Sequence, residues 1–143
     1  MKCVGIIWNS AFEFKEEILK LMSNYSTVED WFCINLDSNY ENFVRLIYSA
    51  DSIAEWKVDK KIEYMRHYPS KSICIIQFDM NTSIMRYHDK KKHMVYANLQ
   101  DLKDLIRKTY GSKLPFYFFD IVFHCSESPE EYDVDCQIIN SFR

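Results

Sequence analysis

The chain has 143 residues, of which 48% are hydrophobic and 16% aromatic, and its formal net charge at pH 7 is −3. This length and composition predict one folded domain that spans residues 1–143. The acidic balance excludes general nucleic-acid binding, which needs a basic surface, and no apolar stretch approaches the length of a membrane span. We therefore expect neither nucleic acid nor a membrane among the partners.

The five cysteines are scattered, odd in number and never spaced as C-x-x-C. Three of them, Cys3, Cys33 and Cys74, lie in or beside apolar runs, as is typical of reduced thiols that pack as small hydrophobes. This usage, and an N-terminus without a signal-peptide pattern, predict a cytoplasmic protein without disulfides. The histidines are spaced too irregularly to predict a metal site, and a chain with two glycines has no glycine-rich phosphate loop.

The first part of the chain alternates apolar runs with amphipathic segments. Cys3–Trp8 is short, apolar and rich in β-branched residues, which predicts a buried strand. In Phe12–Asn24 the apolar residues recur at helical spacing, so this segment is predicted to form an amphipathic helix. Asp30–Leu36 is predicted to be a second strand and Tyr40–Ala50 a second helix.

The middle of the chain is predicted to contain a third helix and a central strand. The helix begins at Asp51-Ser52 and ends near Tyr68, just before a proline. Ser72–Phe78 is apolar and rich in β-branched residues, which indicates a strand at the centre of a sheet. Ser83–Tyr87 fits either a short strand or a loop.

The last part of the chain is predicted to form a helix, a strand and a final helix. Asn98 is expected to cap a helix over Leu99–Tyr110, which Gly111 ends. Leu114–Phe123 is almost entirely apolar and is predicted to be the fourth strand. Ser128–Ile139 has apolar residues at helical spacing and is predicted to be the last helix.

This order of elements predicts an α/β (α+β) fold: a ferredoxin-like sandwich, βαββαβ, with an inserted helical pair and a C-terminal helix. Such a sheet is mostly antiparallel, with helices on one face. The competing arrangement is an open, doubly wound parallel sheet, although the nucleotide-binding loop that usually follows its first strand is absent here.

One histidine, His124, lies where the fourth strand is predicted to end and the last helix to begin. Ser128 suits the N-cap of that helix, Pro129 its first position, and Glu131 the acidic position of a capping box. A rigid scaffold on both sides suits a reactive side chain, but a strand-end histidine that only packs or meets water has the same local pattern. Both interpretations stay open at this level.

The segment His124–Glu131, HCSESPEE, resembles the H-G-S-D-S segment of the nucleoside diphosphate kinases, whose histidine is transiently phosphorylated. Ile6–Ala11 similarly resembles the I-K-P-D-A segment of that family, and Glu63–Met65 resembles its E-Y-M segment. The resemblance extends loosely over most of the chain. It implies the family's ferredoxin-like fold, with a helical pair after the second strand.

The resemblance also implies a phosphotransferase site for a nucleotide or another phosphorylated small molecule. His124 would accept the terminal phosphate, and Ser126 would lie in the same pocket. Asp135, eleven positions after the histidine, would hold the other ring nitrogen and so fix the tautomer. Mg²⁺ would enter with the nucleotide, and no separate metal site is expected. The cationic side chains expected to bind phosphate are Arg86, Lys103 and Arg107.

Several residues of the family pattern are replaced in this chain. Trp8 stands in place of the lysine of I-K-P-D-A, Asp120 in place of an arginine before the histidine, and Ile121 in place of an asparagine. Phosphoryl transfer depends on positive groups that stabilise the transferred phosphate. A second interpretation therefore stays open, a non-catalytic α/β domain that retains the fold only and binds a partner or its own copies. We expect the chain to form homo-oligomers.

Overall fold

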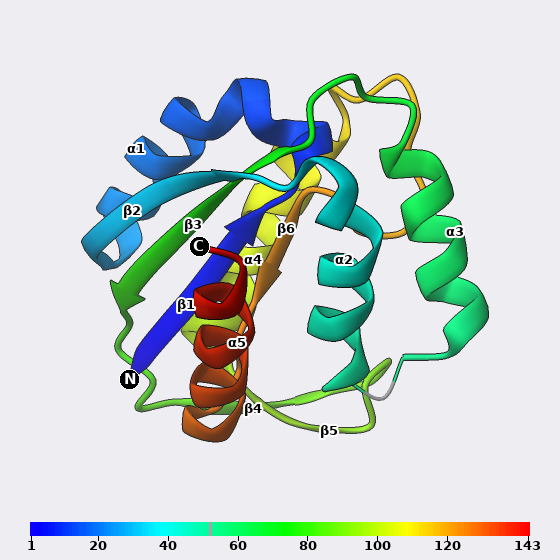
Figure 1. Ribbon diagram of the computed structural model, residues 1–143. Coiled ribbons are helices and arrows are strands. Elements are labelled where there is room, and N and C mark those ends of the chain that lie inside the picture. Colours follow the sequence, from blue (N-terminus) through cyan, green and yellow to red (C-terminus); the bar gives the residue numbers. More distant parts are fainter. Residues whose placement is uncertain (52) are drawn as a thin grey trace.

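The computed structural model describes residues 1–51 and 53–143, and Figure 1 shows how its helices and strands are arranged. The predicted helical start at Asp51-Ser52 falls partly on Ser52, which lies outside the described residues. Within the described residues, the third helix begins later than predicted, at Glu55.

Four strands form one antiparallel sheet in the order β2-β3-β1-β6 (Figure 1). The strands are β1 (Lys2–Ile7), β2 (Thr27–Asn35), β3 (Ser72–Asp79) and β6 (Phe123–Cys125). Antiparallel pairing at every junction excludes the doubly wound parallel arrangement. The prediction of a ferredoxin-like α/β sandwich is confirmed.

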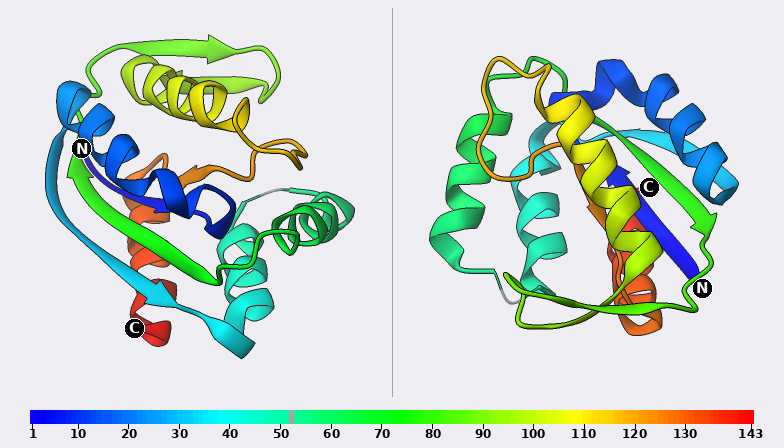
Figure 2. Two further views of the ribbon diagram at one scale, coloured as in Figure 1. Left: turned by 90° about the horizontal axis from the view of Figure 1, so that it is seen from above. Right: turned by 180° about the vertical axis from the view of Figure 1, so that it is seen from behind.

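Helices cover both faces of this sheet. The helices are α1 (Lys15–Tyr25), α2 (Tyr40–Ser49), α3 (Glu55–Met65), α4 (Ala97–Gly111) and α5 (Pro129–Phe142), with short 3-10 turns at Asn9–Phe14 and Asp37–Asn39. Figure 2 shows α1 and α4 on one face and α5, beside α2, on the other. The expectation of helices on one face was wrong, because α2 and the C-terminal helix α5 lie on the face that the two crossover helices leave free, while α3 packs against α2.

The central strands are buried on both sides because of these two helical layers. In β1 every residue after Lys2 is buried, and β3 is buried along most of its length. This explains why Cys3–Trp8 and Ser72–Phe78 are nearly unbroken apolar runs without a period of two. None of the helices in the described part of the chain combines the length and the apolar composition that a membrane span requires.

A hairpin of β4 (Met85–His88) and β5 (His93–Tyr96) forms a separate two-stranded sheet before α4. Ser83–Tyr87 was predicted to be either a short strand or a loop, and the structure shows a short strand, β4, that overlaps it. β5 was not predicted. The hairpin runs directly into α4, so Tyr96 and not Asn98 occupies the N-cap position, and no side chain caps this end. The expectation of an Asn98 cap was therefore wrong.

The predicted fourth strand, Leu114–Phe123, is mostly irregular backbone, and β6 begins only at Phe123. Its aromatic side chains pack sideways instead of entering the sheet: the ring of Phe118 stacks on Tyr64 with centroids 5.2 Å apart. Phe119 is 48% exposed and has a φ of 49°, a left-handed conformation that a strand cannot contain. This segment connects α4 to β6 past the end of α3.

Candidate functional site

His124 is the middle residue of β6, opposite Ile6 of β1, and Asp135 lies in the second turn of α5. The helix lies across β1, so its buried face brings the Oδ2 atom of Asp135 to 3.0 Å from Nε2 of His124. Both residues are nearly inaccessible, at 6% and 2% exposure. An ionised carboxylate only accepts hydrogen bonds, so in the neutral ring Nε2 carries the proton and Nδ1 keeps its lone pair.

Aromatic side chains hold the imidazole from two sides. Tyr48 of α2 meets the ring of His124 edge-on, with centroids 5.6 Å apart and an interplanar angle of 82°. Trp8 is fully buried, its ring centroid lies 6.4 Å from that of His124, and its Nε1 donates to the hydroxyl of Tyr48 at 3.1 Å. Trp8 therefore positions Tyr48, and it contributes no positive charge where the family has its lysine.

The Nδ1 atom of His124 faces a second carboxylate, Asp51, whose Oδ2 lies 3.9 Å away. Glu131 of α5 is close to Asp51, and burial together with that neighbouring carboxyl group raises the pKa of Glu131 to about 7. The capping box forms as predicted at the Ser128 end, where the N–H of Glu131 donates to the Ser128 hydroxyl at 3.1 Å. The Glu131 carboxylate accepts from the N–H of Glu127 at 2.6 Å.

A raised carboxyl pKa makes the folded state less stable as pH rises. Glu131 is protonated in both states below its ordinary pKa of 4.5, and the stability it contributes there is lost as pH rises through about 7. Because the side chain is only partly buried, we expect a loss of about 1 kcal/mol, less than the full shift implies. Urea unfolding between pH 4.5 and 8 should show this slope in wild type and not in Glu131→Gln. Glu130→Gln, which changes the exposed neighbour, is the control and should lose stability with pH as wild type does. If all three proteins show the same pH dependence, Glu131 is not its source.

A cavity of about 780 Å³ opens beside His124. Elements distant in the sequence form its wall, among them α3, the β4–β5 turn, α4 and the connection to α5. The cationic side chains that line it are Lys57, Lys61, Lys90, Lys91, Lys103 and Arg107. The carboxylates that line it are Asp51, Asp120, Glu127 and Glu131. Cations outnumber carboxylates, so the wall carries a net positive charge in a chain whose overall charge is −3.

Arg107 and Asp120 form an ion pair at the base of this cavity, with Nε of Arg107 2.8 Å from Oδ2 of Asp120. The same guanidinium donates twice to the carbonyl oxygen of Phe123, at 3.1 Å in each case. Although burial opposes it, the Asp120 carboxylate raises the pKa of Arg107. Lys61 donates to the backbone carbonyl of Asp120, so two cations secure the segment that leads to His124.

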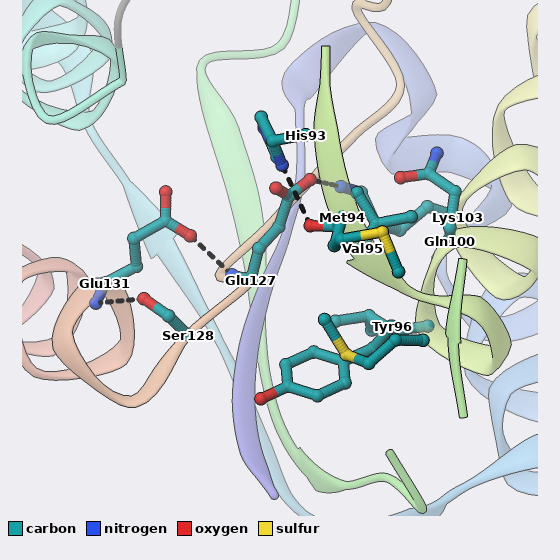
Figure 3. A pocket seen from close by; sticks show the side chains of 11 residues that line it. His93, Met94, Val95, Tyr96, Gln100, Lys103, Glu127, Ser128 and Glu131 are labelled. Atoms are coloured by element: carbon teal, nitrogen blue, oxygen red, sulfur yellow. Dashed lines mark hydrogen bonds and ion pairs between the residues drawn. The ribbon is translucent and has the colours of Figure 1, made fainter. Parts of the chain in front are cut away.

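A second ion-pair cluster joins α4 to the start of α5. Lys103 and Lys91 both donate to one oxygen of Glu127, Oε1. Burial alone would raise the pKa of Glu127, but the two ammonium groups hold it at about 2. Glu127 and Lys103 also line a smaller adjoining cavity of about 350 Å³, together with Met94 and Tyr96. Figure 3 shows Glu127 beside Lys103 there.

Three of the six predicted site residues, Ser126, Arg86 and Asp135, are not among the described residues that line the cavity. Ser126 is 1% exposed, and its hydroxyl accepts a hydrogen bond from the N–H of Val4 at 2.9 Å, which fastens the end of β6 to β1. Arg86 lies on β4 and pairs with Asp101 at 2.7 Å on the surface. His124, Lys103 and Arg107 line the cavity, and Asp135 contacts it through His124.

The sequence interpretation missed several residues of this wall. The sequence could have indicated Lys61, because this lysine falls at helical spacing between Val58 and Met65, on the apolar face of α3. Burial lowers the pKa of the Lys61 ammonium. Asp51 and Lys91 lie in connecting segments, where no periodicity indicates which way a side chain points. In the described part of the chain, no three His, Cys, Asp or Glu side chains gather as metal ligands.

No protein-family model and no curated protein matches this chain. Two solved structures are similar in fold. A nucleoside diphosphate kinase of Aquifex aeolicus has a TM-score of 0.58 and 12% sequence identity, with 96% of this chain and 93% of that chain covered. A nucleoside diphosphate kinase family protein from Babesia bovis has a TM-score of 0.55 and 9% identity, with 96% and 86% covered. Together with the strand order, this likeness over nearly the entire length shows that the chain has the fold of the nucleoside diphosphate kinases.

Proposed function

We propose that this protein binds a nucleotide through its phosphates in the 780 Å³ cavity and that Nδ1 of His124 accepts a phosphoryl group there. One observation carries the proposal: a histidine whose Nε2 is held by a buried carboxylate lines a cavity with a surplus of positive charge. A lone pair fixed on Nδ1 is what a nucleophilic imidazole needs, and the cations suit an anionic ligand.

The proposed step is a displacement at the terminal phosphorus of a nucleoside triphosphate. The Nδ1 lone pair forms the new N–P bond while the bond from phosphorus to the bridging oxygen breaks, and the nucleoside diphosphate leaves with that electron pair. The imidazole gains positive charge as the bond forms, and the Asp135 carboxylate at Nε2 stabilises this charge. The reverse reaction passes the phosphoryl group to a second nucleoside diphosphate.

Aromatic side chains at the rim of the cavity favour a nucleotide over inorganic phosphate as the ligand. Phe119 lines the cavity, and its ring meets that of Trp56 with centroids 6.3 Å apart. Both side chains are about half exposed, at 48% and 57%, so a flat base can reach them. A volume of about 780 Å³ is within the usual range for sites that hold molecules of nucleotide size.

Mg²⁺ enters this proposal with the nucleotide. Such an ion usually keeps several waters and is held by substrate phosphates with one or two carboxylates. Asp51, whose Oδ2 lies 3.9 Å from Nδ1, and Glu131, which lines the same cavity, are the carboxylates that would serve, and the ion would neutralise charge on the phosphates.

Labelling with ATP that carries a radioactive terminal phosphate tests the proposal directly. Wild type should gain acid-labile, alkali-stable label in the presence of Mg²⁺, and His124→Asn should gain none. His93→Asn is the matched control, because His93 lines the same cavity and should keep full labelling. Absence of label on wild type under conditions where ATP raises its melting temperature would contradict the transfer and leave only binding.

A second candidate is a non-catalytic domain that associates with its own copies. It is favoured by the Asp51 carboxylate near Nδ1, which opposes an incoming phosphate, and by the outer edge of β2, an edge strand of nine residues. Trp31 of β2 is 46% exposed. An unlabelled wild type that sediments as an oligomer and whose melting temperature ATP does not change would favour this candidate.

A further inference from the structure

The Glu127 carboxylate lies between two ammonium groups that come from separate parts of the fold. Lys103 is on α4 and is 2% exposed, and Lys91 is in the turn between β4 and β5. Both donate to the same oxygen, Oε1 of Glu127. Lys91 is further held by the amide oxygen of Gln100 at 3.1 Å. Two cations are thus aimed at one point in the wall of the cavity that contains His124.

The charges at this point do not balance. Two ammonium groups meet one carboxylate, and the ion pairs of both lysines within the described chain are to Glu127. A surplus positive charge in a largely buried cluster is costly unless an anion shares it. A phosphate monoester carries nearly two negative charges and three acceptor oxygens, so it matches the two lysines better than a carboxylate does.

The Glu127 side chain has space to move away. It lines the 780 Å³ cavity and also the adjoining cavity of about 350 Å³ that Figure 3 shows, so a rotated carboxylate would enter the second one. Its backbone stays fixed, because its N–H donates to the Glu131 carboxylate at 2.6 Å. Displacement therefore requires only rotation of the side chain.

We propose that Lys91 and Lys103 form a phosphate subsite of the cavity and that Glu127 is its built-in competitor, which a phosphate group displaces. The inference rests on the proposed function for the class of ligand. It does not require phosphoryl transfer, because the subsite binds a terminal phosphate whether or not His124 accepts it.

Calorimetric titration of the full chain with pyrophosphate tests the competition. Glu127→Gln removes the competing charge and should bind pyrophosphate about tenfold more tightly than wild type. Lys91→Gln should bind it about tenfold more weakly. Lys92→Gln is the matched control, because this lysine is in the same turn but outside the set of described residues that line the cavity, and its affinity should be unchanged.

Equal or weaker binding by folded Glu127→Gln would overturn the proposal and leave Glu127 as an ion pair that joins α4 to α5. Glu127→Gln leaves Lys103 buried without its carboxylate partner. If this variant does not fold, the affinity of Lys91→Gln for pyrophosphate tests the proposal instead. Unchanged affinity in Lys91→Gln would then overturn it. The same titrations on a His124→Asn background separate this outcome from the labelling result, since they measure binding alone.

Discussion

Asp135→Asn is expected to reduce the proposed phosphorylation of His124 by about 10²- to 10⁴-fold with little change in stability. The Oδ2 atom of Asp135 lies 3.0 Å from Nε2, and both side chains are buried, so this carboxylate decides which ring nitrogen carries the proton. An asparagine of the same shape can donate its amide to Nε2, which moves the ring proton to Nδ1. The nitrogen proposed to attack phosphorus then has no free lone pair.

Two measurements distinguish this positioning role from a general weakening of the protein. Nitrogen NMR of the histidine ring should report the Nε2-protonated tautomer in wild type and the other tautomer in Asp135→Asn. Asp133→Asn serves as the control, because it removes a carboxylate from the exposed side of the same helix and should change neither labelling nor tautomer. An unchanged tautomer with lost labelling would show that Asp135 acts in another way.

Asp120→Ala is expected to lower the free energy of unfolding by about 3 kcal/mol or more. It leaves the largely buried Arg107 guanidinium without the carboxylate that lies 2.8 Å from it. It also removes the acceptor for the N–H groups of Val122 and Phe123, at 2.9 and 3.2 Å, which shape the approach to β6. Loss of one partner of a buried pair is costly because the other charge stays behind.

Urea unfolding of matched variants measures how much of this cost is due to burial. Asp59→Ala removes an equally short ion pair, 2.8 Å to Arg45, but one exposed to solvent, and should cost at most about 1 kcal/mol. Asp120→Asn keeps an acceptor for the backbone and should fall between the two. Similar losses for Asp120→Ala and Asp59→Ala would mean that the pair with Arg107 is no stronger than a surface contact.

The resemblance to the nucleoside diphosphate kinases pointed to His124 and Asp135, and local rules explain why these two side chains meet. Ser128 and Pro129 fix the first turn of α5, and the observed cap bond from Glu131 confirms that start. Once the helix start is fixed, helical geometry determines which residue of the next turns can face β6. Asp135 reaches Nε2 from this position, with its Oδ2 atom 3.0 Å away.

The prediction failed between α4 and β6, where hydrophobicity was taken for strand structure. β1 offers pairing partners only to Phe123–Cys125, so the preceding aromatic residues have no neighbouring strand to join. They pack instead against the end of α3 and the residues that follow it, where Phe118 stacks on Tyr64 and Phe116 stacks on His67, with centroids 5.2 and 4.3 Å apart. A period in the sequence indicates burial, but it does not indicate which element provides the surface.

The cationic side chains were only partly predictable for the same reason. Lys103 and Arg107 are four positions apart on α4, and this spacing places them on one helix face. Arg86 was chosen from a segment whose hairpin geometry was not foreseen, and its partner is Asp101 on the surface. Lys91, five positions later, lines the cavity together with Lys90 and His93 of the same hairpin.

The place of β1 between β3 and β6 has a consequence for the order of folding. Val4 and Ser126 exchange two hydrogen bonds, of 2.9 and 3.0 Å, across a sequence separation of 122 positions. During synthesis one edge of β1 stays unpaired until the chain has been made as far as Cys125. We therefore expect insertion of β6 to be a late, non-local step, and nascent chains shorter than this to expose a strand edge that can pair between copies.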